Sequence, residues 1–205
     1  AGRVGALDLG FLPGEGGKDF AGILDGAQSG DVEVVYNLGA DECNTTKMRD
    51  AFVIYQGSHG DAGARYADVI FPAAAYTEQN AIFVNTEGRA QLATRASFPP
   101  GEAREDWAII RAFSDHLGKT LPYDDMFALR QAMLEEAPTM GRIDQIGGDE
   151  TSFDINAVGA AGSVDSAALV SPVQDYYLTN PIARASKTMA ECSSVMSSSG
   201  KIAAE

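Results

Sequence analysis

The residues whose types and spacing could support binding or catalysis lie in a few predicted loops. The loop 57–63, GSHGDAG, spaces its glycines as GxxGxxG directly after an apolar run. A glycine-rich turn after a strand can let backbone N–H groups cradle a phosphate. This spacing is neither the GxGxxG of dinucleotide-binding folds nor a P-loop, and no lysine follows in the P-loop position. The favoured interpretation is a tight turn that needs positive φ.

Two further sets of residues could carry chemistry. His59 and Asp61 are placed to form a general acid/base pair, but no nucleophile stands near them, so a structural role is favoured. The two cysteines, Cys43 and Cys192, belong to no CxxC motif. An all-cysteine iron–sulfur cluster needs about four thiolates. Tetrahedral zinc is disfavoured because only His59 and His116 could be added. No catalytic, cofactor-binding or metal-binding residue is therefore predicted.

Charged groups elsewhere have structural interpretations. Glu87 and Arg89 are expected to pair across a turn. The run 101–106, GEARED, indicates a helix start, where carboxylates favour the positive end of the macrodipole. Trp107 is predicted to anchor that helix in the core. The amphipathic stretch 178–192 is expected to dock, either on a partner or on the remainder of its own chain.

Size and charge bound the functional classes. The 205 residues are 45% hydrophobic and 21% charged, which suits a folded domain with a core. The net charge of −14 disfavours nucleic acid and anionic membranes, which both carry dense negative charge. No apolar run approaches the ~20 residues of a membrane span. The start lacks a methionine, so a processed product or a fragment of a longer chain is expected.

Periodicity predicts the elements that must position these residues. Apolar residues at helical spacing predict a helix over 19–28, and apolar runs predict strands over 32–38, 51–57 and 67–73. Such strands, joined by crossings of about ten or more residues, indicate part of a doubly wound, mostly parallel α/β sheet. Ligands in that layout lie beyond the carboxyl ends of the strands. Those ends carry Gly39–Cys43, Gly57–Gly63 and Ala73–Glu78.

The remaining segments are predicted as follows. A β-hairpin covers 81–93, two helices cover 103–117 and 124–136, and 4–12 forms a loop or a short strand. After about residue 140 the chain is rich in Gly, Asp and Ser, which predicts an extended tail. A short helix around Ile182–Met189 and a frayed SSSG end complete it. The predicted domains are 1–138 and a docking tail, 139–205.

The stretch YQGSHGDAGARYADVIFPAAAYTEQNAIFVNTEGRAQLATRASFPPGEAREDWAIIRAFSDHLGKTLPYD, residues 55–124, resembles a known family. It is similar to the large iron–sulfur subunit of respiratory complex I, called the 75 kDa subunit in mitochondria and the G subunit in bacteria. TNPIARASKTMAEC (179–192) resembles the end of that subunit, and VGALDLGFLPG (4–14) resembles a segment upstream of its sheet. The pattern ADVIFPAA…EGR in 67–89 is similar to the wider molybdopterin oxidoreductase superfamily.

The resemblance implies a degenerate enzyme fold retained as a scaffold. The family's [4Fe–4S] and [2Fe–2S] clusters belong to an N-terminal portion without counterpart here, so no cluster ligand is carried over to Cys43 or Cys192. The implied function is a structural C-terminal portion of a peripheral-arm subunit of proton-pumping NADH:quinone oxidoreductase. The implied partners are the other peripheral-arm subunits and the N-terminal part of the same subunit.

The implied location is the matrix side of the mitochondrial inner membrane or the cytoplasmic face of a bacterial plasma membrane. The resemblance also implies that this chain is the C-terminal part of a longer subunit, either truncated or separately encoded. The alternative functions are an oxidoreductase fragment that holds molybdopterin or a nucleotide at the strand ends, near Gly57–Gly63, and a free-standing α/β protein.

Overall fold

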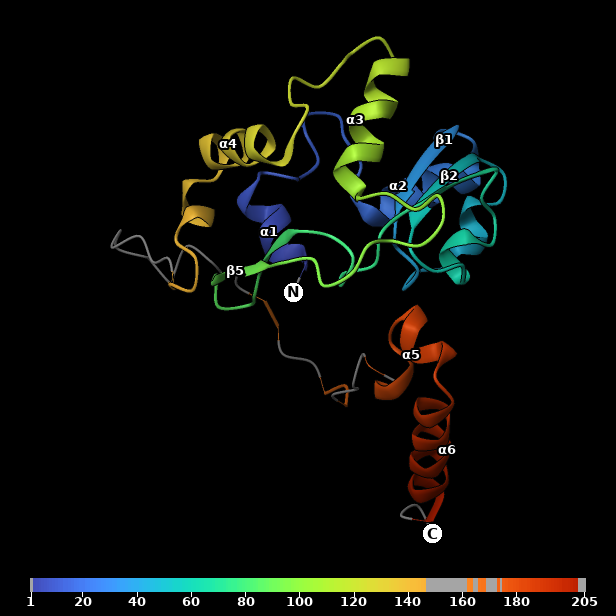
Figure 1. Cartoon of the computed structure of the whole chain (residues 1–205). Coiled ribbons are helices and arrows are strands. Elements are labelled where there is room, and N and C mark those ends of the chain that lie inside the picture. The colour runs from blue at the N-terminus through green and yellow to red at the C-terminus, as the bar shows by residue number, and fades with distance from the viewer. Residues whose placement is uncertain (1, 147–161, 164–165, 169–172, 174, 203–205) are drawn as a thin grey trace. The chain divides into compact units, whose positions relative to one another are not determined.

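The described residues of a computed structural model are 2–146, 162–163, 166–168, 173 and 175–202. They belong to two compact units, Ala1–Gly147 and Gly148–Glu205. The first unit holds the strands, and the second holds the helices near the C-terminus (Figure 1). None of the described helices combines the length and apolar character that a membrane span requires.

A three-stranded parallel sheet lies at the centre of the first unit. Its strands are β1 (Val34–Leu38), β2 (Phe52–Gly57) and β3 (Val69–Pro72), in the order β1-β2-β3. These strands confirm the three predicted ones, because β-branched and aromatic residues suit a pleated, half-buried surface. Gly39 follows β1 with φ +64°, a conformation that favours glycine, and Pro72 ends β3 because it has no N–H to donate.

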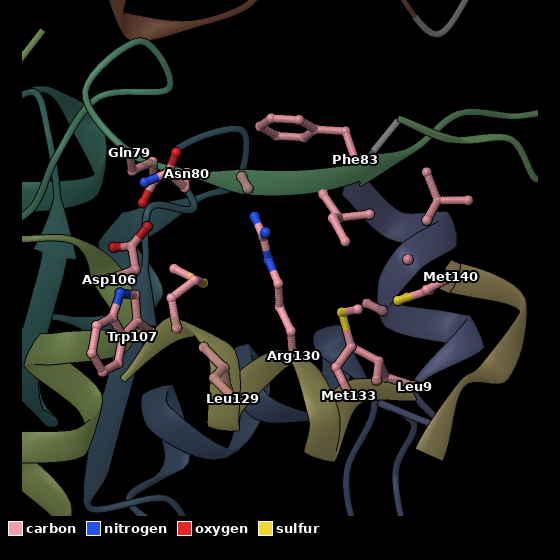
Figure 2. Close-up of a pocket in the computed structure, with 16 residues that line it drawn as sticks. Leu9, Gln79, Asn80, Phe83, Asp106, Trp107, Leu129, Arg130, Met133 and Met140 are labelled. Carbon is pink, nitrogen blue, oxygen red and sulfur yellow. The ribbon is translucent and has the colours of Figure 1, made fainter. Parts of the chain in front are cut away.

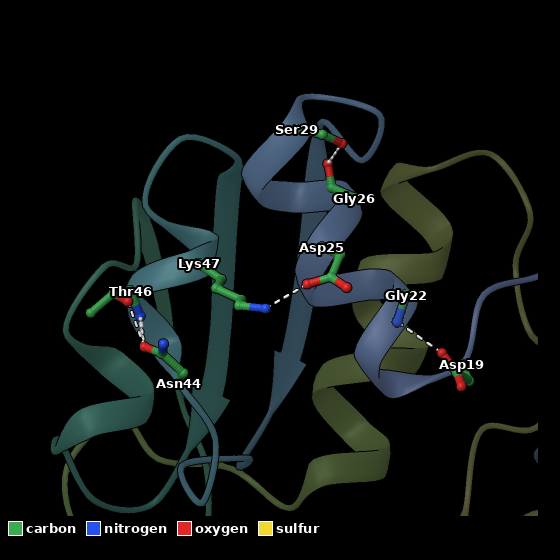
Figure 3. A network of polar contacts seen from close by, with 8 residues as sticks. All are labelled: Asp19, Gly22, Asp25, Gly26, Ser29, Asn44, Thr46 and Lys47. Carbon is green, nitrogen blue, oxygen red and sulfur yellow. Dashed lines mark hydrogen bonds and ion pairs between the residues drawn. The ribbon is translucent and has the colours of Figure 1, made fainter.

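One face of the sheet is covered by α2 (Phe20–Ser29), in agreement with the periodicity over 19–28. Val35 and Val53 are register partners on this face and pack into one buried cluster. Its other members are Leu24, Ala27, Met48 and Ala51. The helix is fixed at its start by Asp19, whose carboxylate accepts from Gly22 N at 2.8 Å, and an ion pair of 2.5 Å joins Asp25 to Lys47 (Figure 3).

The opposite face carries α3 (Asp106–His116). The ring of Phe113 lies 5.6 Å from that of Tyr36 and 5.7 Å from that of Phe71, centroid to centroid. Tyr36 and Phe71 alternate with the residues that face α2, because successive side chains of a strand point to opposite faces. The unit therefore layers helices on both sides of a small parallel sheet, which confirms the α/β class.

A separate antiparallel hairpin pairs β4 (Ala81–Val84) with β5 (Ala90–Ala93). Gly88 has φ +79° in its turn, and Asn85 Oδ1 accepts from the backbone N–H of Glu87 and Arg89 at 3.0 Å each. These contacts confirm the predicted hairpin. A second core cluster sits on it, formed by Val84, Ala90, Ala137 and Met140.

The segment predicted as a loop or short strand over 4–12 begins as a helix, α1 (Gly2–Asp8). The prediction was wrong because tertiary contacts can override the low helix propensity of glycine. A Cβ on Gly5 would lie 3.4 Å from Val84 Cγ2, so the bare backbone of α1 seats against β4. Gly10, with φ +67°, follows the end of the helix.

In the second unit, η5 (Tyr176–Leu178), α5 (Pro181–Ala185) and α6 (Lys187–Ile202) follow one another. Asn180 Oδ1 accepts from Ala183 N at 2.9 Å, and Ser186 Oγ accepts from Met189 N at 3.3 Å, so each α-helix starts at a side-chain cap. The predicted fraying of SSSG was wrong, because α6 continues through it. Most of the predicted extended stretch, 147–172, lies outside the described residues.

Candidate functional site

The glycine loop after β2 is folded around a tyrosine ring. None of Gly57, Gly60 and Gly63 has positive φ, so the prediction of a turn that needs positive φ is wrong. A Cβ on Gly57 would lie 2.3 Å from Tyr55 Oη, and one on Gly63 would lie 2.8 Å from both Ala40 O and Tyr55 Cε2. Two of the three glycines are therefore required by close packing, and Tyr55 occupies the space beside them.

The polar side chains of this loop make local bonds. His59 Nδ1 lies 2.9 Å from Ser58 Oγ, and the carbonyl of His59 accepts from Tyr55 Oη at 2.8 Å. Asp61 Oδ1 accepts from Ala62 N at 2.7 Å and thereby starts the short turn η2 (Ala62–Ala64). These contacts give His59 and Asp61 a part in shaping the loop.

The two cysteines belong to different units. Cys43 is half-buried and packs against the cluster beneath α2. Burial, and next the nearby carboxylate of Asp41, raises the pKa of the Cys43 thiol. Less thiolate is then present near neutral pH, which disfavours a nucleophilic or metal-binding role. Cys192 lies in α6. Within the part of the chain that the structure describes, no three His, Cys, Asp or Glu residues group closely enough to hold a metal ion.

A buried polar network, which the sequence patterns did not reveal, joins the sheet to α3. Gln56 is fully buried; its Oε1 accepts from the Tyr36 hydroxyl, and its Nε2 donates to Asp106 Oδ1 at 2.7 Å. Burial, and next the carboxylate of Asp106, raises the pKa of Tyr36. The one signal in the sequence is a polar residue within the apolar run 51–57. The network fixes the start of α3 against β2.

A second buried polar residue closes the end of β1. Asn37 Nδ2 donates to Ala40 O at 2.9 Å and to Gly63 O at 3.2 Å, while Asn37 Oδ1 accepts from Ala40 N at 3.0 Å. The loops after β1 and β2 are thus tied together beyond the carboxyl ends of the strands. At this edge of the sheet, where a doubly wound fold would hold its ligand, the two loops contact each other directly.

The predicted roles of the hairpin and helix charges can be compared with the structure. Glu87 Oε2 lies 3.7 Å from a guanidinium nitrogen of Arg89, which confirms their pairing. Glu105 precedes α3 without a side-chain cap, and its Oε2 accepts from Trp107 Nε1 at 2.7 Å. Trp107 is half-buried and borders a pocket, so it is less enclosed than the predicted core anchor.

That pocket has a volume of about 440 Å³ and lies among α1, β4, the start of α3 and α4 (Met126–Glu136) (Figure 2). The position of α4 is set by Asp125, whose Oδ1 accepts from Ala128 N at 2.8 Å, and by Met133 and Leu134, which pack on the hairpin cluster. The pocket wall is mainly apolar. Its polar groups are Gln79, Asn80, Asp106 and Arg130.

Family models match two segments of the chain. Residues 1–116 match the model described as molybdopterin oxidoreductase. Residues 135–192 match the model that describes the C-terminal part of the G subunit of NADH-ubiquinone oxidoreductase.

Curated relatives are similar over nearly the whole chain. The mitochondrial 78 kDa subunit of NADH-ubiquinone oxidoreductase from Candida albicans is 42% identical over 201 residues, which cover 94% of this chain and 26% of the relative. The 75 kDa subunit from Reclinomonas americana is 40% identical over 195 residues, which cover 95% of this chain and 28% of the relative. The chain therefore spans about a quarter of the length of these relatives.

Among solved structures, acetylene hydratase from Pelobacter acetylenicus matches with a TM-score of 0.48 and 16% identity. The match covers 58% of this chain and 18% of that chain.

Proposed function

We propose that this chain is a structural portion of the complex I 75/78 kDa subunit. The chain belongs to the molybdopterin oxidoreductase family, and it corresponds to the C-terminal region of that subunit. In this role it supports electron transfer from NADH to quinone without holding a redox centre. The observation that carries the proposal is the match of 135–192 to the C-terminal model of the G subunit.

The surface of the first unit supports a docking role. Val34 and Phe52 are register partners on the sheet face that carries α3, yet they are 57% and 48% exposed. Leu38, on the same face, is 51% exposed. Large apolar patches on a surface mark sites of protein contact. We infer that the exposed part of this face packs on the remainder of the subunit or on a neighbouring peripheral-arm subunit.

The same reasoning extends the proposal to architecture and location. The three parallel strands would belong to a larger doubly wound sheet of molybdopterin-oxidoreductase type, with residues 139–205 as a docking tail of the parent subunit. The assembly would lie on the matrix side of the mitochondrial inner membrane or on the cytoplasmic face of a bacterial plasma membrane.

A pterin or nucleotide at the strand ends fits the residues poorly. A cofactor phosphate needs open backbone N–H groups, whereas the space beside Gly57 and Gly63 is filled by Tyr55 and Ala40 O. The crevice of about 420 Å³ that borders this loop is lined by the carboxylate of Asp61 as well as by Arg65. The residues present do not match the group that the family name implies, so no reaction step is assigned to it.

The test is copurification. The tagged chain, expressed in its source organism, is isolated from membranes in mild detergent, and the bound proteins are identified by mass spectrometry. We expect complex I subunits. Phe52→Asp should reduce their recovery, because it places a charge on the exposed part of the sheet face. Lys119→Ser, at an exposed position outside the sheet, should leave their recovery unchanged. Recovery of the chain without complex I subunits would refute the proposal.

A further inference from the structure

The pocket among α1, β4, α3 and α4 has the dimensions of a small-molecule site. Its volume of about 440 Å³ falls within the range of about 300–1,000 Å³ that ligand pockets occupy. Residues of α1, β4, α3 and α4 all contribute to its wall, so it is formed by tertiary packing of the first unit.

The wall suits a flexible aliphatic chain. Met126, Met133 and Met140 line the pocket with Leu9 and Leu129. Methionine is unbranched and polarizable, so a cluster of methionines adapts to an aliphatic ligand better than a rigid wall does. Met133 packs against the hairpin cluster that contains Met140, and Figure 2 shows both side chains at one end of the pocket.

Arg130 is the group that this apolar wall leaves unexplained. Arg130 belongs to α4, and Figure 2 shows its guanidinium extending across the pocket toward β4. Arg130 is half-buried, and among the described residues it forms no hydrogen bond or ion pair. A guanidinium carries five donors in a fixed plane and is always charged. An oxyanion within the pocket would satisfy it.

Asp106 lines the same pocket but does not serve as that anion. Its Oδ1 accepts from Gln56 Nε2 at 2.7 Å, and its backbone carbonyl accepts from the same amide at 3.3 Å, so the residue is held toward the sheet. Its charge nonetheless limits which anion the pocket accepts. A pocket that holds one guanidinium and one carboxylate, in a chain of net charge −14, favours a monoanion over a phosphate dianion.

We propose that this pocket binds an amphiphilic monocarboxylate, with the carboxylate paired to Arg130 and the aliphatic chain along the methionine-lined wall. The planar fork of arginine matches a carboxylate in a bidentate geometry. The amides of Gln79 and Asn80 lie at one end of the pocket, where they add polar character near the head group. The inference rests on this pocket alone and does not depend on the proposed function.

The single tryptophan makes the pocket directly observable. Trp107 is the only tryptophan of the chain, and it lines the pocket. The experiment titrates the whole 205-residue chain with ω-bromoundecanoate, whose bromine quenches tryptophan fluorescence on contact, and in parallel with the uncharged ω-bromoundecanol. We expect saturable quenching by the acid at one molecule per chain.

The variants separate the guanidinium from general apolar binding. Arg130→Gln should weaken binding of the acid by about 10-fold or more, the usual effect of losing a charge-assisted hydrogen bond, and should leave binding of the alcohol unchanged. Arg130→Lys should fall between Arg130→Gln and the unmodified chain. Asp106→Asn should tighten binding of the acid, because it removes a repelling charge. Arg49→Gln, at an exposed ion pair with Asp50, is the matched control and should bind as the unmodified chain does.

Three results would overturn the proposal. One is the absence of saturable quenching by the acid. Another is equal binding by Arg130→Gln and Arg49→Gln, with far-UV circular dichroism showing that both are folded. The third is equal quenching by acid and alcohol in every variant, which would make the pocket an apolar seam for another part of the subunit.

Discussion

Replacing Gly63 by alanine tests why the loop after β2 is rich in glycine. A Cβ at this position would lie 2.8 Å from both the backbone oxygen of Ala40 and Tyr55 Cε2. Tyr55 is 3% exposed and held by its hydroxyl, so neither neighbour can move away cheaply. Gly60, in the same GxxGxxG motif, has no positive φ, and a Cβ added to it would meet nothing within 4 Å.

The magnitude follows from overpacking. Extra atoms in a well-packed site cost about 1–3 kcal/mol. Displacement of Gly63 O also weakens its 3.2 Å bond from Asn37, which adds about 1 kcal/mol. Gly63→Ala should therefore lower the free energy of unfolding by about 2–4 kcal/mol. Gly60→Ala should change it by less than about 1 kcal/mol, and in the stabilising direction, because alanine restricts the unfolded chain.

Urea unfolding followed by circular dichroism measures both variants against the unmodified chain. Each kcal/mol corresponds to about 2–4 °C in Tm for a chain of this size. If Gly63→Ala were as stable as Gly60→Ala, the close approach of Gly63 to Ala40 and Tyr55 would not be what requires glycine, and the packing explanation would fail.

Three further perturbations test the sheet and its helices. Gln56→Leu should lower the free energy of unfolding by about 1–3 kcal/mol for each partner that it leaves without a bond, which are Asp106 and the Tyr36 hydroxyl. Urea unfolding would show no such loss if the network were unimportant. The raised pKa of Tyr36 means that its contribution to stability is fully present below pH 10.0, the ordinary tyrosine value, and is lost as pH rises through the folded-state pKa. Tyr36→Phe should therefore reduce the alkaline fall in stability, and an unchanged pH profile of stability would contradict this. Asp19→Ala should lower the free energy of unfolding by about 1 kcal/mol, because α2 loses its cap. This loss should exceed that of Asp25→Ala, whose ion pair with Lys47 is largely exposed, and equal losses would count against the cap.

Local patterns are enough to predict most elements of the first unit. The strands are recognisable because an apolar β-branched run bounded by Gly39 or Pro72 has few alternatives. The hairpin turn is recognisable from Asn85 and Gly88, whose side-chain bond and positive φ act within four residues of chain. Helix α1 escapes prediction because it packs against β4, about eighty residues further along the chain.

The composition and local order of this chain determined its class: an acidic α/β protein with fewer cysteines than an all-cysteine iron–sulfur cluster needs. Tertiary structure decided what each conspicuous residue does. Gly57 and Gly63 pack closely around Tyr55, and Gln56 links β2 to α3. Arg130, inconspicuous in the sequence, lines a mainly apolar pocket that Trp107 also lines. Local sequence determines backbone preference over a few residues, whereas close approach, burial and charge pairing depend on segments that only the folded chain brings together.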